Sequence, residues 1–149
     1  MAGLKVHFPS GEVVLTAAAI KTVLQVVAVA NHRTIVKGFS VHGKGVVSTD
    51  TPMRVRLVRQ TTAGTMSAGV LVKNDTSDSE VIQTTGQINA TIEPTVTDII
   101  DTFEVHPQTG LIYMLPPGDE IQIPGGTRLG FDVLAAQGQT VTVKVFLEE

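Results

Sequence analysis

Residues 140–147 read TVTVKVFL, and this alternation of polar and apolar residues predicts a β-strand with one buried face. Its apolar side comprises Val141, Val143, Val145 and Leu147. Its polar side comprises Thr140, Thr142 and Lys144, and only Phe146 interrupts it. Val and Thr are β-branched, and such residues suit a pleated, half-buried surface. The stretch therefore indicates a half-buried sheet.

The same alternation recurs in other segments of the chain. Residues 53–57, for example, place apolar side chains on one side and two arginines on the other. The expected buried positions are Met53, Val55 and Leu57, then Ile35, Phe39 and Val41, then Ile121 and Ile123, and finally Leu129, Phe131 and Val133. Strands are expected in all of these segments.

The segment 17–30 fits two interpretations. Ile20, Val23, Leu24 and Val27 satisfy the spacing of an amphipathic helix. The β-branched residues between positions 22 and 29 favour instead a strand that is buried on both faces. Residues 17–19, all alanine, form a candidate helical turn.

Turn residues recur at short intervals along the chain, and the segments between them are too short for typical helices. Examples are Pro9-Ser10-Gly11, Asn74-Asp75, Pro116-Pro117-Gly118 and Pro124-Gly125-Gly126. A chain of 149 residues without a linker or repeat fits one domain. We therefore expect an all-β, single-domain β-sandwich, jelly-roll-like, with about eight to ten strands. A simple up-and-down barrel is the nearest alternative.

Composition narrows the classes of partner. The chain has 11 Lys and Arg against 14 Asp and Glu, which are dispersed, so no nucleic-acid partner is expected. It contains no cysteine, which excludes disulfides and Cys-ligated zinc. Residues 1–9 lack the pattern of a signal peptide. The longest apolar stretch, 17–30, is shorter than the roughly 20 residues of a membrane helix, so we expect a soluble chain with no membrane partner.

Motifs that carry chemistry are not evident in the sequence. The histidines His7, His32, His42 and His106 lie far apart and show no metal-ligand spacing. The serine-nucleophile signature G-x-S-x-G is absent. No catalytic, cofactor-binding or metal-binding residue is predicted, and the chain is expected not to be an enzyme. The acidic loop Asn74 to Glu80 offers oxygens for calcium, but a solvated turn is the favoured interpretation.

Arg54 and Arg56 project from the same face of the strand expected at 53–57. Two interpretations are open for this short positive row. In the first interpretation, the two arginines bind acidic groups of a neighbouring subunit. In the second, they form a charged face that contacts solvent, as surface arginines commonly do.

Four stretches resemble small jelly-roll virion proteins of tailed bacteriophages that decorate or cement the capsid. They are AAIKTVLQVV at 18–27, RQTTAGTMSA at 59–68, HPQTG at 106–110 and PGGTRLG at 124–130. The resemblance implies a virion protein, assembled in the host cytoplasm, that binds the outside of the major capsid protein shell as a homotrimer. Stabilising a shell requires contact area and complementarity and no reactive residues.

Residues 1–12 suit the same role as an extended arm ahead of a β-sandwich domain at 13–149. Leu4, Val6 and Phe8 alternate with Lys5 and His7, so the segment is a candidate strand for a neighbour's sheet. A frayed terminus is the alternative. The predicted assembly contacts are therefore Leu4, Val6, Phe8, Arg54 and Arg56.

Two other functions compete with assembly. One is a carbohydrate- or receptor-binding module on a virion fibre or tail, which low aromatic content disfavours: Tyr113 and five Phe are the aromatic residues, and Trp is absent. The other is an enzyme of cupin-like architecture, which the missing paired His and Glu ligands disfavour.

Overall fold

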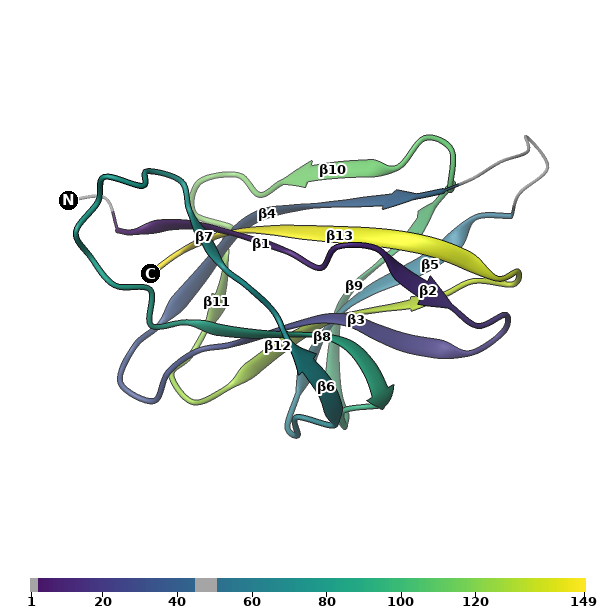
Figure 1. The fold of residues 1–149 in the computed structure, drawn as a ribbon, viewed down its shortest axis with the longest axis horizontal. Helices are drawn as coiled ribbons and strands as arrows, with labels where there is room; N and C mark the ends of the chain where they lie inside the picture. The colour runs from purple at the N-terminus through teal and green to yellow at the C-terminus, as the bar shows by residue number, and fades with distance from the viewer. Residues whose placement is uncertain (1–2, 45–50) are drawn as a thin grey trace.

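The protein is an all-β sandwich of two antiparallel sheets (Figure 1). A computed structural model of the chain describes residues 3–44 and 51–149. Thirteen strands are present in this part of the chain. They are β1 (Lys5–Pro9), β2 (Val13–Leu15), β3 (Ile20–Val27), β4 (Thr34–Gly43), β5 (Met53–Gln60), β6 (Thr65–Ala68), β7 (Val72–Lys73), β8 (Thr85–Ile92), β9 (Val96–Val105), β10 (Leu111–Met114), β11 (Ile121–Ile123), β12 (Arg128–Leu134) and β13 (Gln139–Glu148). The expected fold class is confirmed.

Eight of the strands form a jelly-roll framework. Sheet A contains the order β10-β4-β13-β1 and sheet B the order β3-β12-β5-β9, so strands that follow one another along the chain mostly lie in opposite sheets. The remaining strands extend this framework: β7 and β2 beside β1 and β13, β11 beside β4, and β8 and β6 beside β3. The prediction of about eight to ten strands agrees with the eight strands of the framework. It did not include the five additional strands.

Strand β13 lies in the middle of sheet A, between β1 and β4. Its side chains Val141, Val143, Val145 and Leu147 are all buried, as the alternation predicts. The same holds for the inward residues of β5 and β12. The sequence pattern therefore identified the inner faces of these strands correctly.

Two predicted core positions, Ile35 and Ile121, are only half-buried. Ile121 still packs against the core, whereas Ile35 is displaced from it because β4 contains a β-bulge. Phe146 pairs with Gly38 and Leu147 with Val36, so Lys37 is an extra residue in β4. A bulge reverses the alternation beyond it. Val36 is consequently buried, and Ile35, which the sequence placed inward, is only half-buried.

The ambiguous segment is a strand. In β3 five consecutive residues, 22–26, are buried, as expected of a strand covered on both faces. The three alanines before it form no helical turn. They belong to a turn in which the Ala19 amide donates to the Thr16 carbonyl at 3.3 Å and Ala18 has a φ of 57°.

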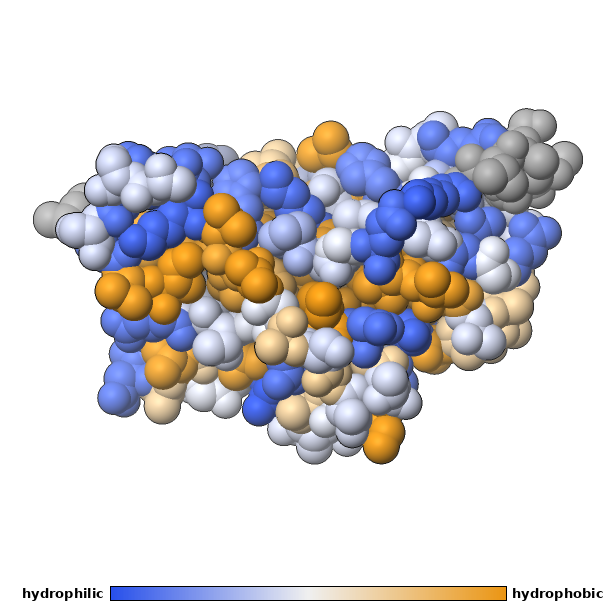
Figure 2. Space-filling view, viewed as in Figure 1, coloured by the Kyte–Doolittle hydropathy of each residue, from blue (hydrophilic) through white to orange (hydrophobic). Residues whose placement is uncertain are grey.

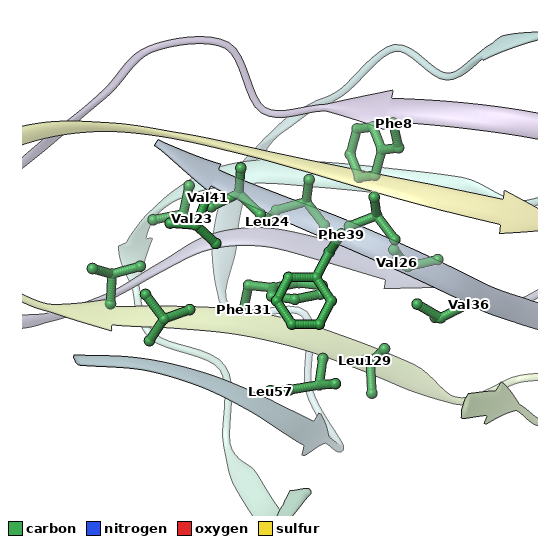
Figure 3. Packing of buried hydrophobic residues seen from close by; sticks show 14 of the residues in the cluster. Phe8, Val23, Leu24, Val26, Val36, Phe39, Val41, Leu57, Leu129 and Phe131 are labelled. Carbon is green, nitrogen blue, oxygen red and sulfur yellow. The ribbon is translucent and has the colours of Figure 1, made fainter. Parts of the chain in front are cut away.

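The core is aliphatic around a few stacked phenylalanines. Phe39 from sheet A and Phe131 from sheet B meet with ring centroids 5.1 Å apart, as Figure 3 shows among the buried valines and leucines. Fully burying such a side chain stabilises the fold by about 1.5–3 kcal/mol. A core of this kind compensates for the absence of tryptophan.

The segment expected to be an arm is a strand of the chain's own sheet. Strand β1 pairs with β13 on one side and with β7 on the other. Leu4, Val6 and Phe8 are at most 3% exposed and belong to the core. Alternation predicted a strand, but the sequence did not reveal that its partners are in the same chain. Residues 1–2 lie outside the described residues.

Strands β5 and β9 pair directly, although residues 61–95 separate them in the sequence. This stretch, which we call the 61–95 excursion, carries β7 to the edge of sheet A and β8 and β6 to the edge of sheet B (Figure 1). The ring of Phe8 packs against Gly69 and Gly86 of the excursion, where a Cβ would collide with it. The excursion thus closes one flank of the sandwich, and β9 and β10 form the other.

Candidate functional site

The predicted arginine row is not a free positive surface. Arg56 donates from Nε and Nη2 to the two carboxylate oxygens of Asp132 on β12, at 2.8 and 2.6 Å. These bonds raise the pKa of Arg56 above its ordinary value. Arg54 lies opposite Glu104 of β9, but the structure records no ion pair between them. Arg56 is therefore paired within the chain. Of the two arginines, only Arg54 fits the proposed contact with acidic groups of a neighbouring subunit.

A second buried polar network anchors the excursion to the outer face of sheet B. Gln25 Nε2 donates to Gln60 Oε1 at 2.8 Å and to the Thr62 carbonyl at 3.1 Å. Thr22 donates from its amide and hydroxyl to one oxygen of Glu93, at 2.8 and 2.6 Å. Buried polar groups are stable only when hydrogen-bonded, so these contacts fix both ends of the excursion.

This network was not predicted from the sequence, although the sequence contains a signal for it. Gln25 interrupts a doubly buried strand, and Asp132 interrupts the apolar residues of β12. A polar side chain in such a position needs a partner. The sequence pattern shows that these polar side chains need hydrogen-bond partners. It does not identify the partners, because they lie far away in the sequence.

The second flank of the sandwich exposes apolar side chains from both edge strands. Within the described residues, β9 pairs only with β5 and β10 only with β4. Exposed fractions are 53% for Ile99, 38% for Ile100, 66% for Ile112, 37% for Tyr113 and 57% for Met114. Phe103 and Tyr113 join the two strands, with ring centroids 5.4 Å apart. We call this surface the β9–β10 flank.

Acidic residues and bulges modify the edge of β9. Asp98, Asp101 and Glu104 lie along it, and register shifts leave Ile100 and Thr97 as extra residues. Charges and bulges both discourage strand-to-strand pairing at a sheet edge. The apolar side chains of the flank, more than its backbone groups, are therefore suited to contact a partner.

The excursion flank is also partly apolar. Figure 2 shows hydrophobic residues in a band between the two sheets on the face that carries β1, β2 and β7. The exposed apolar residues of these strands and of the excursion include Val14, Val70, Val72 and Val81. Exposed apolar side chains that gather into one patch are typical of interaction sites. The sandwich consequently presents two different apolar surfaces on opposite flanks.

The outer face of sheet A holds a charged cluster beside a cavity of about 390 Å³. Lys37 Nζ lies 3.0 Å from a Glu148 oxygen and 3.2 Å from a Glu120 oxygen. Hydrogen bonds to Glu148 and then Glu120 raise the pKa of Lys37, and the bond from Lys37 lowers the pKa of Glu148. The cluster is internally paired and offers no unpaired acid or base.

The acidic loop forms local turns. Asp75 Oδ1 accepts hydrogen bonds from the hydroxyl and amide of Ser77, which lower the pKa of Asp75, and Asp78 Oδ1 accepts one from the Glu80 amide. Across residues 3–44 and 51–149, no group of three or more His, Cys, Asp or Glu side chains is placed to hold a metal ion.

Comparison with family models, with curated proteins and with solved structures finds no match to this chain. In the part of the chain that the structure describes, no helix is long and apolar enough to cross a membrane.

Proposed function

We propose that this chain is a virion structural protein that binds the outside of a phage capsid shell and stabilises it, assembled as a trimer. The identity of the shell comes from the resemblance of four stretches to small jelly-roll virion proteins. The observation that supports an assembly role is the pair of apolar surfaces on opposite flanks of one sandwich.

Two different surfaces suit a closed ring. In a two-fold dimer one patch contacts its own copy, whereas a ring with head-to-tail contacts requires two distinct patches per subunit. The β9–β10 flank and the excursion flank supply two such patches. A standard interface buries roughly 800 Å² per partner, about a tenth of the 7455 Å² surface of this chain.

Stabilisation of a shell then follows from mass action. A protein that binds the intact shell and not its separated subunits shifts the equilibrium toward the intact state. Binding and stabilising a shell in this way requires contact area and no reactive residue.

The test is the mass of the protein in solution, followed by co-sedimentation with shells of tailed phages. Ile112→Lys places a charge on the β9–β10 flank, where Ile112 is 66% exposed. Val29→Lys is its control, because Val29 is 39% exposed and lies in the loop after β3, outside both the excursion and the β9–β10 flank. We expect a trimer for the unaltered chain and for Val29→Lys, and monomers for Ile112→Lys. A strictly monomeric protein that sediments with no shell overturns the proposal.

A further inference from the structure

Arg59 of β5 lies at one end of the sandwich with an unsatisfied donor. Its Nη1 is buried and has no hydrogen-bond partner among the described residues. Asp98 is directly opposite Arg59 in the β5–β9 ladder, yet the structure records no ion pair between them. Arg59 as a whole is half-buried, but a donor nitrogen that is desolvated without a partner is costly, so its place in the fold requires an explanation.

The side chain borders a cavity of about 350 Å³. Besides Arg59, the wall includes Arg128, Asp98, Thr61, Thr97 and Thr127. Two arginines against one aspartate leave the wall with a net positive charge. Burial lowers the pKa of Arg59, and the attraction of Asp98 only partly opposes this effect. The positive charge is therefore undercompensated within the chain.

The threonines in the cavity wall differ in whether their hydroxyl groups already donate a hydrogen bond. Thr127 donates its hydroxyl to the Pro124 carbonyl at 2.7 Å, and Thr97 donates to the Arg59 carbonyl at 3.4 Å. Among residues 3–44 and 51–149, the Thr61 hydroxyl forms no hydrogen bond. Arg128 is held on one side, since its Nη1 donates to Gln25 Oε1 at 3.1 Å. Arg59 and Thr61 thus retain donors for a ligand.

We propose that this cavity binds a small oxyanion, with Arg59 and Thr61 as its principal donors and Arg128 as a second positive charge. Arginine recognises phosphate and carboxylate groups through pairs of parallel hydrogen bonds. Because Nη1 of Arg59 has no hydrogen-bond partner among the described residues, turning the guanidinium toward an anion breaks no hydrogen bond of this nitrogen. Asp98 opposes binding and limits the affinity.

The oxyanion has two possible sources, a free tetrahedral anion or the carboxylate of a partner protein. Both ligands present negatively charged oxygen atoms that accept hydrogen bonds. The site does not depend on the proposed function, because none of the exposed apolar side chains of the two flanks lines its cavity.

Calorimetric titration of the full chain with inorganic phosphate and with acetate tests the proposal, with chloride at equal ionic strength as the reference. We expect saturable binding of at least one oxyanion. Phosphate alone indicates a free tetrahedral ligand, and acetate alone indicates a carboxylate. If neither anion gives more signal than chloride, the proposal is wrong.

Variants then assign the site. Arg59→Gln should weaken binding at least about tenfold, as expected when a charged hydrogen bond is lost. The control is Arg33→Gln, because Arg33 is exposed, donates to Gln122 Oε1 and does not line the cavity. Asp98→Asn should tighten binding, and Thr61→Val should weaken it, which keeps the test valid if Arg59→Gln does not fold. Binding that is unchanged in Arg59→Gln, or in both Asp98→Asn and Thr61→Val, contradicts the proposal.

Discussion

Asp132 is only 1% exposed, and both of its carboxylate oxygens accept hydrogen bonds from Arg56 on the neighbouring strand. The pair lies on the outer face of sheet B, the face to which the 61–95 excursion is anchored. A carboxylate in such a place depends on its partner, because an unpaired buried charge is strongly unfavourable.

Removal of one partner should therefore destabilise the protein. We expect Arg56→Gln to lower the free energy of unfolding in urea by about 3–5 kcal/mol. The double variant Arg56→Met with Asp132→Leu should lose less, since it leaves no buried charge. Lys44→Gln is the control: its ion pair with Glu12 is exposed, and its loss should cost at most about 1 kcal/mol. Equal losses in Arg56→Gln and Lys44→Gln would contradict the assignment.

Gly130 gives a second prediction about the outer face of sheet B. A Cβ at this position would collide with the side-chain oxygen of Gln60, which the buried network holds in place. Gly130→Ala should lower the free energy of unfolding by about 1–3 kcal/mol. Gly138→Ala, where the nearest atom to a Cβ is 3.7 Å away, should change it by less than about 0.5 kcal/mol. Thermal and urea unfolding of both variants test the difference.

The turn before β3 predicts a stabilising substitution. Ala18 has a φ of 57°, a left-handed conformation that is unfavourable for residues with a Cβ. Ala18→Gly should therefore raise the free energy of unfolding by up to about 1 kcal/mol. Ala17→Gly, at a neighbouring position without positive φ, should instead lower it by about 0.4–1 kcal/mol. A loss of stability in both variants would refute the strain at Ala18.

Lys37 predicts how stability responds to pH. The folded-state pKa of Glu148 is lowered, so its contribution is present above its ordinary value of 4.5 and is lost as the pH falls below that value. The folded-state pKa of Lys37 is raised, so its contribution is complete below 10.5 and is lost at higher pH.

Urea unfolding between about pH 3 and pH 6 measures the acid side of this dependence. The free energy of unfolding should fall less steeply with acid in Lys37→Met than in the unaltered chain. Lys44→Met should keep the original slope, because the partner of Lys44 is well exposed. Parallel slopes in all three proteins would show that the Lys37 cluster does not contribute.

Much of the fold was predictable because its signals are local. Alternation at 53–57 and 140–147 identified inner faces, and frequent turn residues excluded long helices. The bulge at Lys37 carries no comparable signal, and it displaced Ile35 from its expected position. The arm at residues 1–12 was misassigned for a related reason: a strand pattern shows which side is buried, but not which strand covers it.

The candidate sites were less predictable, because they depend on long-range partners. Arg56 was recognised as an outward arginine, but Asp132 is 76 residues away in the sequence. The β9–β10 flank joins side chains of two strands from different sheets, and only the topology brings Phe103 and Tyr113 together. The composition, rich in Val and Thr, indicated that the chain has strands with surface for packing. It did not indicate where on the fold the contact surfaces lie.

The central place of β13 in sheet A has a consequence for synthesis. Residues 139–148 fill the space between β1 and β4, so a nascent chain lacks the middle of this sheet until residue 148 has been added. Pairing between segments so distant in sequence is slow, because loop-closure entropy opposes it. We therefore expect copies truncated before β13 to lack a stable fold and to be readily cleaved by proteases.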